Sequence, residues 1–225
     1  MRHHRWDNGA RLMDLWFSRA SAVAPSYGFP DTQTIRMNSW VLTFPRAKAV
    51  YDQIIRERIW VNTAAQRQIA VMLRRNGLLR SQLQSIEFGD LATPISMLDK
   101  DYVNQRVVNF GLSDMDDMTA ALGNFAFRVV VSGGITPKSG SSRYVVTISE
   151  VGVYLRDSYD FGGTQFLGFW DDKKNSVSML NPIAGFPVTN DDFRSWRVNM
   201  GKGGDFLVFS DLLRIKLTTP DSFEI

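Results

Sequence analysis

The sequence contains no cysteine, and its only histidines are His3 and His4. Without thiols the chain cannot form a disulfide scaffold, a cysteine nucleophile or a zinc-thiolate site. Two adjacent histidines near one end are also poorly placed for a Ser-His-Asp triad or a histidine-rich metal site. These absences leave carboxylate side chains as the main candidates for chemistry.

Long apolar runs and nucleotide-binding motifs are missing as well. No apolar stretch reaches the roughly 18 residues of a membrane span, and no apolar segment follows the basic N-terminus as in a Sec signal. The chain has neither a P-loop nor a Gly-x-Gly-x-x-Gly motif after a strand. We therefore expect no transmembrane segment, no dinucleotide fold and, if the protein is exported, a route other than Sec.

The charge is unevenly distributed along the 225 residues. The first 85 residues carry 13 Lys or Arg and 5 Asp or Glu, whereas the remainder carries 13 and 18. A basic half can indicate a surface for phosphate or anionic lipid, but arginines on solvent-exposed helix faces explain it equally well. Most tryptophans lie within apolar runs, which is typical of core residues, and this pattern argues against nucleic-acid binding.

The first third of the chain has helical periodicity. Apolar residues recur every three to four positions in three segments, which we predict to be helices: 7–20, 46–58 and 63–76. Asp7 or Asn8 is predicted to cap the first helix, Pro45 to open the second and Gly77 to end the third. The short apolar run 35–44 predicts a strand.

From about residue 80 the pattern changes to alternating β-branched and aromatic residues, which favour strands. A strand beginning at Phe125, a turn-rich segment from Gly133 to Ser142 and a strand over 144–155 predict a long antiparallel pair. The other predicted strands are 84–88, 103–110, 164–170, 206–209 and 213–218. Short helical segments are predicted over 113–122 and 190–196.

Helices followed by strands predict an α+β fold. We expect N-terminal helices, about residues 7–77, packed on a mostly antiparallel, strongly curved β-sheet formed by about residues 80–225. Because the helical layer can cover one face of the sheet, a single domain spanning 1–225 is expected.

Asp157, Tyr159 and Asp160 lie where the strongest predicted strand gives way to a Gly-Gly turn. In an extended backbone Asp157 and Tyr159 share one side, and a turn at 160–163 would bring both carboxylates together. Paired carboxylates can hold Mg²⁺ with phosphate oxygens, or one can act as a general base. The alternative is that both aspartates simply stabilise turns through Asx hydrogen bonds.

A second candidate is the segment Gly201-Lys202-Gly203-Gly204-Asp205-Phe206. Its glycines would let the backbone approach an anion closely, and Lys202 would add charge. The alternative is a tight loop that leads into the strand from Phe206. Three acidic doublets (116–117, 171–172 and 191–192) are better explained as helix-start charges and a hairpin loop.

Three segments together resemble an uncharacterised bacterial domain family whose members are often encoded beside type VI secretion genes. They are residues 7–17 (DNGARLMDLWF), Tyr159-Asp160-Phe161 with Leu167-Gly168-Phe169-Trp170, and residues 201–206. This resemblance, which covers nearly the whole chain, implies an interbacterial effector with an immunity protein or a secretion component as partner. Such a protein is made in the bacterial cytoplasm and delivered to the periplasm of a target cell.

The element Asp157-x-Tyr159-Asp160 is similar to the Asp-x-Tyr-Asp signature of the colicin M toxins. That similarity implies that these three residues are catalytic, that Asp157 and Asp160 bind Mg²⁺ and that the substrate is the lipid-linked precursor lipid II. The colicin signature continues to a His-Arg pair, where this chain has Gln165-Phe166. Either Lys202 or Asp205 supplies the missing group at the substrate, or the element is a turn without catalysis.

Two hypotheses follow from these patterns. The first is an antibacterial effector toxin that hydrolyses lipid II or another phosphate-bearing envelope precursor with Mg²⁺. The second is a non-enzymatic, secretion-associated adaptor that binds a protein partner, with the acidic positions serving as turns.

Overall fold

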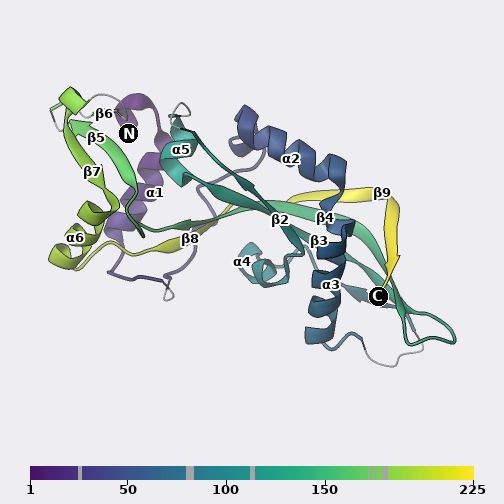
Figure 1. The fold of residues 1–225 in the computed structure, drawn as a ribbon. Coiled ribbons are helices and arrows are strands. Elements are labelled where there is room, and N and C mark those ends of the chain that lie inside the picture. The colour runs from purple at the N-terminus through teal and green to yellow at the C-terminus, as the bar shows by residue number, and fades with distance from the viewer. Residues whose placement is uncertain (25–26, 80–83, 112–114, 172, 175, 179–181) are drawn as a thin grey trace. The chain divides into compact units, whose positions relative to one another are not determined.

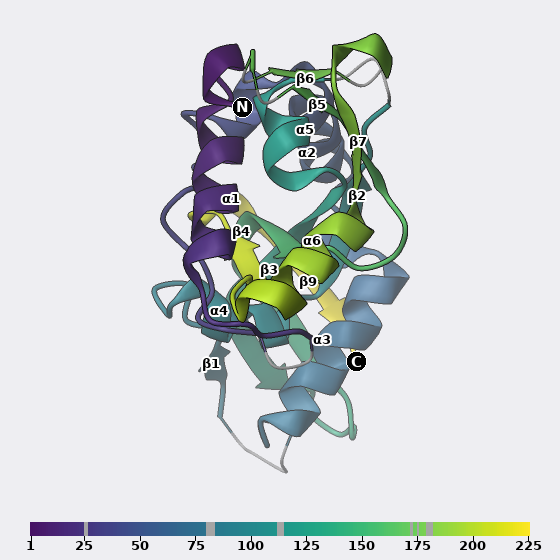
Figure 2. The ribbon, with the colours of Figure 1, turned by 90° about the vertical axis from the view of Figure 1, so that its left-hand side faces the viewer.

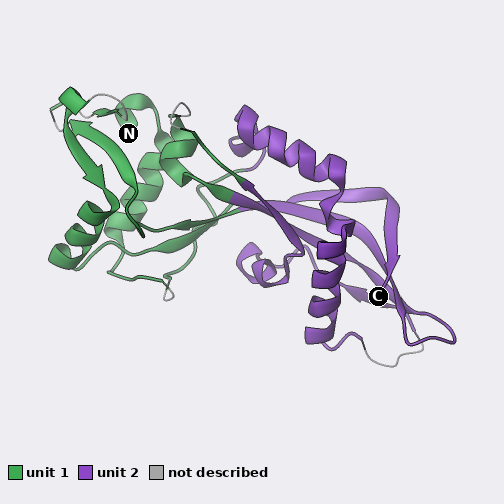
Figure 3. Cartoon of the chain, viewed as in Figure 1, with its two compact units in different colours: residues 1–36, 108–125, 156–210 green, residues 37–107, 126–155, 211–225 purple. Residues whose placement is uncertain are grey.

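The computed structural model describes residues 1–24, 27–79, 84–111, 115–171, 173–174, 176–178 and 182–225 (Figure 1). The chain forms two units, each built from three separate segments (Figure 3). Unit 1 comprises residues 1–36, 108–125 and 156–210, and unit 2 comprises residues 37–107, 126–155 and 211–225. The α+β class is confirmed, whereas a single domain over 1–225 stays a prediction.

Unit 2 contains the helices α2 (Pro45–Glu57), α3 (Thr63–Arg75) and α4 (Ile95–Leu98), and the 3-10 turns η2 (Val41–Thr43), η3 (Ile59–Val61) and η4 (Asp99–Asp101). Its strands are β1 (Ile86–Phe88), β2 (Asn104–Val108), β3 (Phe125–Pro137), β4 (Tyr144–Tyr159) and β9 (Leu213–Glu224), and the ends of β2, β3 and β4 reach into unit 1. In the larger sheet the order is β1-β3-β4-β8, with β2 on β3 and β9 on β4.

Unit 1 contains the helices α1 (Asp7–Ser18), α5 (Asp117–Leu122) and α6 (Asn190–Met200), and the 3-10 turns η1 (Arg2–His4) and η5 (Pro182–Ala184). The strand β8 (Phe206–Phe209) pairs antiparallel with the end of β4. A separate three-stranded antiparallel sheet has the order β6-β5-β7, formed by β6 (Ser176–Ser178), β5 (Phe166–Asp171) and β7 (Phe186–Thr189). None of the helices among the described residues is long and apolar enough to cross a membrane.

The helix α2 covers the sheet of unit 2, as the sequence predicts. Pro45 occupies its first turn, where the fixed φ of proline suits a helix start. Ala47 and Ile54 are fully buried, and the Tyr51 ring meets the Phe127 ring of β3 at 6.2 Å between centroids. Apolar burial along one face therefore holds the helix against the strands.

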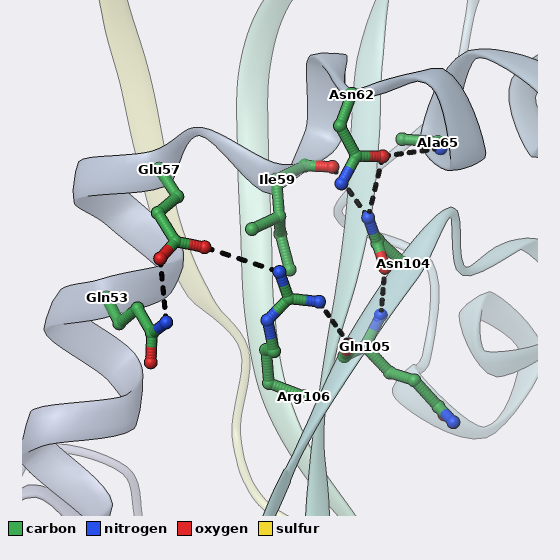
Figure 4. Close-up of polar contacts among 8 residues, drawn as sticks. All are labelled: Gln53, Glu57, Ile59, Asn62, Ala65, Asn104, Gln105 and Arg106. Atoms are coloured by element: carbon green, nitrogen blue, oxygen red, sulfur yellow. Dashed lines mark hydrogen bonds and ion pairs between the residues drawn. The ribbon is translucent and has the colours of Figure 1, made fainter.

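Side-chain amides bind the connection between α2 and α3 to β2 (Figure 4). The Asn104 Nδ2 of β2 donates to the Ile59 carbonyl at 2.7 Å and to Asn62 Oδ1 at 3.1 Å. The same Asn62 Oδ1 accepts from the Ala65 amide at 2.9 Å and so caps α3. One amide oxygen thus fixes both the start of the helix and its place beside the strand.

In unit 1 the helices α1 and α5 lie side by side (Figures 1 and 2). A Cβ added at Gly9 would lie 2.9 Å from the Ala120 Cβ, so the two helices approach at a glycine. The Gly9 amide also donates to Asp117 Oδ1 at 2.9 Å. The predicted caps of α1 are wrong, because Trp6 is the N-cap residue and Asp7 is already helical.

The strand predicted over 35–44 is wrong. This segment forms turns and the 3-10 helix η2, and its amides bond locally or to a side chain. Met37 N donates to Asp211 Oδ1 at 2.7 Å, and Leu42 N donates to the Met37 carbonyl at 2.9 Å. Ile35, Met37 and Val41 are nevertheless fully buried, so burial rather than strand pairing explains the apolar run.

The predicted turn-rich segment is wrong at Gly133 and Gly134 but is confirmed over residues 138–142. Gly133 and Gly134 lie within β3 and pair with Phe88 and Glu87 of β1. The hairpin turns later, where the Lys138 amide donates to the Arg143 carbonyl at 3.0 Å. Two adjacent glycines in a sequence usually indicate a turn. Here Gly133 instead allows the backbones of β3 and β4 to approach closely.

Other boundaries differ in length. The strands β4 and β9 and the helix α6 extend beyond their predicted ends, to Tyr159, Glu224 and Met200. The helix α5 begins at Asp117 with Asp116 as its cap, and the predicted earlier start at Ser113 and Asp114 lies outside the described residues. The strand β9 is longer than predicted because its pairing with β4 continues on both sides of a register shift.

The two glycines of β3 provide a matched test of this close approach. A Cβ at Gly133 would lie 1.9 Å from the Thr147 carbonyl oxygen of β4, whereas at Gly134 the nearest atom is Glu87 Oε1 at 3.4 Å. We expect Gly133→Ala to lower the free energy of unfolding by about 2–3 kcal/mol and Gly134→Ala to change it by less than about 1 kcal/mol. Urea denaturation of both variants measures the difference, and equal losses would contradict it.

Candidate functional site

Unit 1 encloses a cavity of about 430 Å³. Much of its lining is apolar or aromatic: Trp6, Met13, Phe110, Phe166, Leu167 and Trp170. The polar lining includes Asp157, Tyr159 and Asp160. A concave space that combines apolar surface with convergent polar groups is typical of a ligand site.

Strand pairing places the first two of these residues. Asp157 lies opposite Val208 of β8, and Tyr159 lies opposite Phe206. Because side chains alternate along a strand, Asp157 and Tyr159 project to the same face. Tyr159 is buried and stacks on Phe206 with ring centroids 5.1 Å apart, so the phenol is held in one position.

Asp160 follows directly after β4 and is exposed. Its Oδ1 accepts from the Gly162 amide at 3.0 Å, and its own amide donates to the Ser158 carbonyl at 3.0 Å. These contacts form the turn predicted over 160–163 and return Asp160 to the cavity that Asp157 and Tyr159 also line. The three residues predicted to be catalytic therefore border one space.

Burial changes the acid–base behaviour of the two strand residues. Loss of solvent is the main cause that raises the pKa of Asp157 to about 7, and the charge of Asp160 adds to it. The Ser158 backbone hydrogen bond and the Arg156 charge act in the opposite direction. Burial and the charge of Asp157 also raise the pKa of Tyr159, so the phenol stays protonated as a hydrogen-bond donor.

Asp205 and Lys202 are not among the residues that line this cavity. The Asp205 carboxylate is buried, accepts from Trp16 Nε1 at 2.9 Å and forms an ion pair with Arg197. The Arg197 guanidinium also lies over the Trp16 ring, 5.0 Å from its centroid. Lys202 is exposed and forms a backbone bridge with Ala20. Neither residue therefore lines the cavity with the first three, and Asp205 has a structural environment.

Two residues that sequence reasoning missed hold the turn beside the cavity. Asn190 is 2% exposed and lines the cavity, and its Nδ2 donates to the Gly162 carbonyl at 2.5 Å. Arg194, one turn further along α6, donates to the carbonyls of Phe161 and Gly163 at 2.5 and 2.6 Å. The sequence shows Asn190 and Arg194 only as part of a helix start, and nothing in it indicates which loop they bind.

The acidic doublets have the predicted structural roles. Asp116 caps α5 through the Thr119 amide at 3.0 Å, and Asp192 forms a capping box with Thr189 at the start of α6. Asp171 Oδ1 accepts from the amides of Lys173 and Lys174 in the hairpin between β5 and β6. Asp172 and Asn175 of this loop lie outside the described residues.

The donor set at the cavity suits a hard cation that also binds a ligand. Among the described residues no group of three or more His, Asp or Glu side chains gathers. Mg²⁺, however, is commonly bound by one or two carboxylates together with substrate phosphates. Asp160 uses Oδ1 in its turn, whereas Oδ2 makes no hydrogen bond with the described residues, so it and Asp157 can serve in this way.

The role of Asp205 can be tested by substitution. Removing one partner of a buried ion pair leaves the other charge uncompensated, so we expect Asp205→Ala to lower the free energy of unfolding by about 3–5 kcal/mol. Lys202→Ala changes an exposed side chain and is expected to stay within about 0.5 kcal/mol of the parent. Thermal and urea unfolding compare the two, and a stable Asp205→Ala protein would show that the ion pair is dispensable.

Asp157 makes stability depend on pH. Its pKa in the folded protein, about 7, lies above the value of 3.8 for a solvent-exposed aspartate. The stabilisation of the protonated carboxyl is therefore complete below about pH 4 and lost as the pH rises through about 7. Between about pH 5 and pH 8 the parent should lose about 2–3 kcal/mol relative to Asp157→Asn. Urea titrations at both pH values measure this loss, and parallel profiles for the two proteins would contradict it.

No curated protein and no solved structure matches this chain. One family model does match, over residues 1–185 and 181–225. Together these two segments span the whole sequence. The chain therefore belongs to the family described as "Family of unknown function (DUF6402)".

Proposed function

We propose that this protein is an antibacterial effector whose unit 1 cavity hydrolyses a lipid-linked, phosphate-bearing envelope precursor such as lipid II. The observation that carries the proposal is that Asp157, Tyr159 and Asp160 all line one cavity of about 430 Å³. The similarity of this element to the colicin M signature supports the choice of substrate class. The resemblance to domains encoded beside type VI secretion genes supports delivery into a competing cell, with an immunity protein as partner.

Asp157 is the proposed general base. A carboxyl group with a pKa of about 7 is ionised in a substantial fraction of molecules near neutral pH and is a stronger base than an ordinary aspartate. It takes a proton from the attacking water as the new phosphorus–oxygen bond forms. The same proton then passes to the lipid alcohol oxygen as its bond to phosphorus breaks.

Tyr159 and Asp160 support this step in different ways. The raised pKa of Tyr159 keeps its phenol protonated, so it can donate a hydrogen bond to a phosphate oxygen as charge develops there. Asp160 would hold Mg²⁺ through its Oδ2 atom, and the ion would supply the positive charge that a pyrophosphate needs beside two carboxylates. Because the described lining residues include no Lys or Arg side chain, the positive charge beside the phosphates depends on the bound Mg²⁺.

The apolar part of the cavity suits the lipid part of the substrate. Phe166 and Trp170 of β5 and Met13 of α1 line the same space as the carboxylates. Transfer of a hydrocarbon chain from water to such surfaces is favourable by about 25 cal/mol for each Å² of apolar area that is buried. An amphipathic ligand could therefore place its chain on these residues and its phosphates at the end of β4.

Substitution of the acidic residues tests the activity. We expect Asp157→Asn and Asp160→Asn each to lower hydrolysis of purified lipid II with Mg²⁺ by at least about 100-fold, because a base or a metal ligand is lost. Tyr159→Phe should lower the rate about 10-fold or more, since one donor to the phosphate is removed. Release of the phosphorylated head group from the lipid measures each rate.

The control for this series is Asp7→Asn, which removes an exposed carboxylate of unit 1 outside the cavity lining. It should retain parental activity and parental toxicity when the protein is expressed in the periplasm. If Asp157→Asn and Asp160→Asn folded normally and hydrolysed lipid II as fast as Asp7→Asn, the hydrolase proposal would be wrong.

A non-enzymatic adaptor is the second candidate function, and exposed apolar side chains of unit 1 favour it. Ile183 is 94% exposed, Phe186 of β7 is 70% exposed, and Val198 of α6 is 81% exposed. Large apolar residues in such positions are common where a protein partner binds. An inactive protein that co-purifies with a secretion component, and loses that component on Phe186→Ser, would support this role over hydrolysis.

A further inference from the structure

A second hollow, of about 570 Å³, lies in unit 2 between α3 and the strand ends of β4 and β9. The helix contributes Arg67, Ala70 and Arg74 to its lining, and the strands contribute Tyr144 and Glu224. Figure 1 shows α3 beside these strand ends. Ala70 lies one turn from each arginine, so its small side chain leaves space between two long cationic ones.

The two arginines are available to a ligand. Both are exposed, and neither guanidinium group makes an ion pair or a hydrogen bond with another described residue. They are seven positions apart on α3, which is about 10 Å along a helix axis. A guanidinium presents a planar set of donors that matches the oxygens of a phosphate group. The groove therefore offers two separate phosphate-binding side chains.

The acidic residue of the groove does not cancel this charge. Glu224 accepts from Lys138 Nζ at 2.5 Å and from Arg143 Nη1 at 3.4 Å. These hydrogen bonds hold the pKa of Glu224 below its usual value, so the carboxylate stays ionised and paired with two cations. Lys138 and Arg143 thus balance the Glu224 carboxylate, and Arg67 and Arg74 add positive charge to the groove, which favours anions.

Apolar side chains beside the arginines narrow the class of ligand. Val71 is 48% exposed and lies one helical turn from both Arg67 and Arg74. Leu79 lines the groove itself. Cationic and apolar side chains exposed together are typical of surfaces that meet the interface of a lipid bilayer, where charge binds head groups and apolar groups reach the acyl boundary.

We propose that this groove of unit 2 binds the phosphate head group of an anionic membrane lipid. Arg67 and Arg74 bind the phosphate oxygens, and Val71 and Leu79 contact the adjacent acyl boundary. This site is distinct from the unit 1 cavity, and its ligand binding requires no hydrolysis. Each basic residue at such a surface strengthens membrane binding by about fivefold.

Vesicle co-sedimentation of the full chain tests the site. We expect binding to phosphatidylcholine vesicles that contain phosphatidylglycerol and much weaker binding to phosphatidylcholine alone. Arg67→Gln and Arg74→Gln should each lower the partition coefficient about fivefold, and the double variant about 25-fold. The matched control is Arg56→Gln, an exposed arginine of α2 outside the groove, which should keep parental binding. A loss in Arg56→Gln equal to that of the groove variants would overturn the proposal.

Two further measurements distinguish binding of a lipid head group from binding of soluble phosphate. Val71→Ser leaves the charge unchanged and should lower vesicle binding about twofold to fivefold, because apolar area at the bilayer is lost. Inorganic phosphate at the same ionic strength as a chloride control should displace little protein from vesicles. If phosphate displaced the protein fully and Val71→Ser bound normally, the groove would be a soluble-anion site and the lipid proposal would be wrong. Circular dichroism confirms that each variant is folded.

Discussion

Continuous pairing of β4 is the constraint on which the unit 1 site depends. The strand remains paired with β8 up to Tyr159, and only Asp160 leaves it. Since side chains alternate on a paired strand, Asp157 and Tyr159 must share a face. The Asx turn at Asp160 then returns a second carboxylate to the same side of the chain. A strand that ended three residues earlier would fix none of these directions.

The chemistry of the site follows from the environment at this strand end. A half-buried carboxyl surrounded by aromatic and apolar side chains loses hydration, which raises its pKa. Asp160, in contrast, is exposed in its Asx turn and keeps its hydration. Two identical side chains three positions apart thus acquire different properties. The proposed reaction uses this difference, with Asp157 as the base and Asp160 as the metal ligand.

The sequence predicts much of the fold because most elements depend on local patterns. The helix from Pro45, the helix ending before Gly77 and the strand from Phe206 follow directly from proline, glycine and β-branched signals. The segment 35–44 could not be predicted in this way, since its buried residues depend on a hydrogen bond from Met37 to the distant Asp211. The site is partly predictable for the same reason: Asp157 to Asp160 are neighbours in sequence, whereas the contacts of Asn190 and Asp205 depend on tertiary packing.

The contact between Trp16 and Asp205 joins residues 189 positions apart in the chain. During synthesis α1 leaves the ribosome well before β8, and its indole can meet this carboxylate only after the intervening residues have been made. Contacts of such long sequence separation form slowly, because a large loop must close first. Unit 1 therefore cannot be completed before residue 205 has been synthesised, and a truncated chain that lacks residue 205 leaves the buried Trp16 indole without this partner.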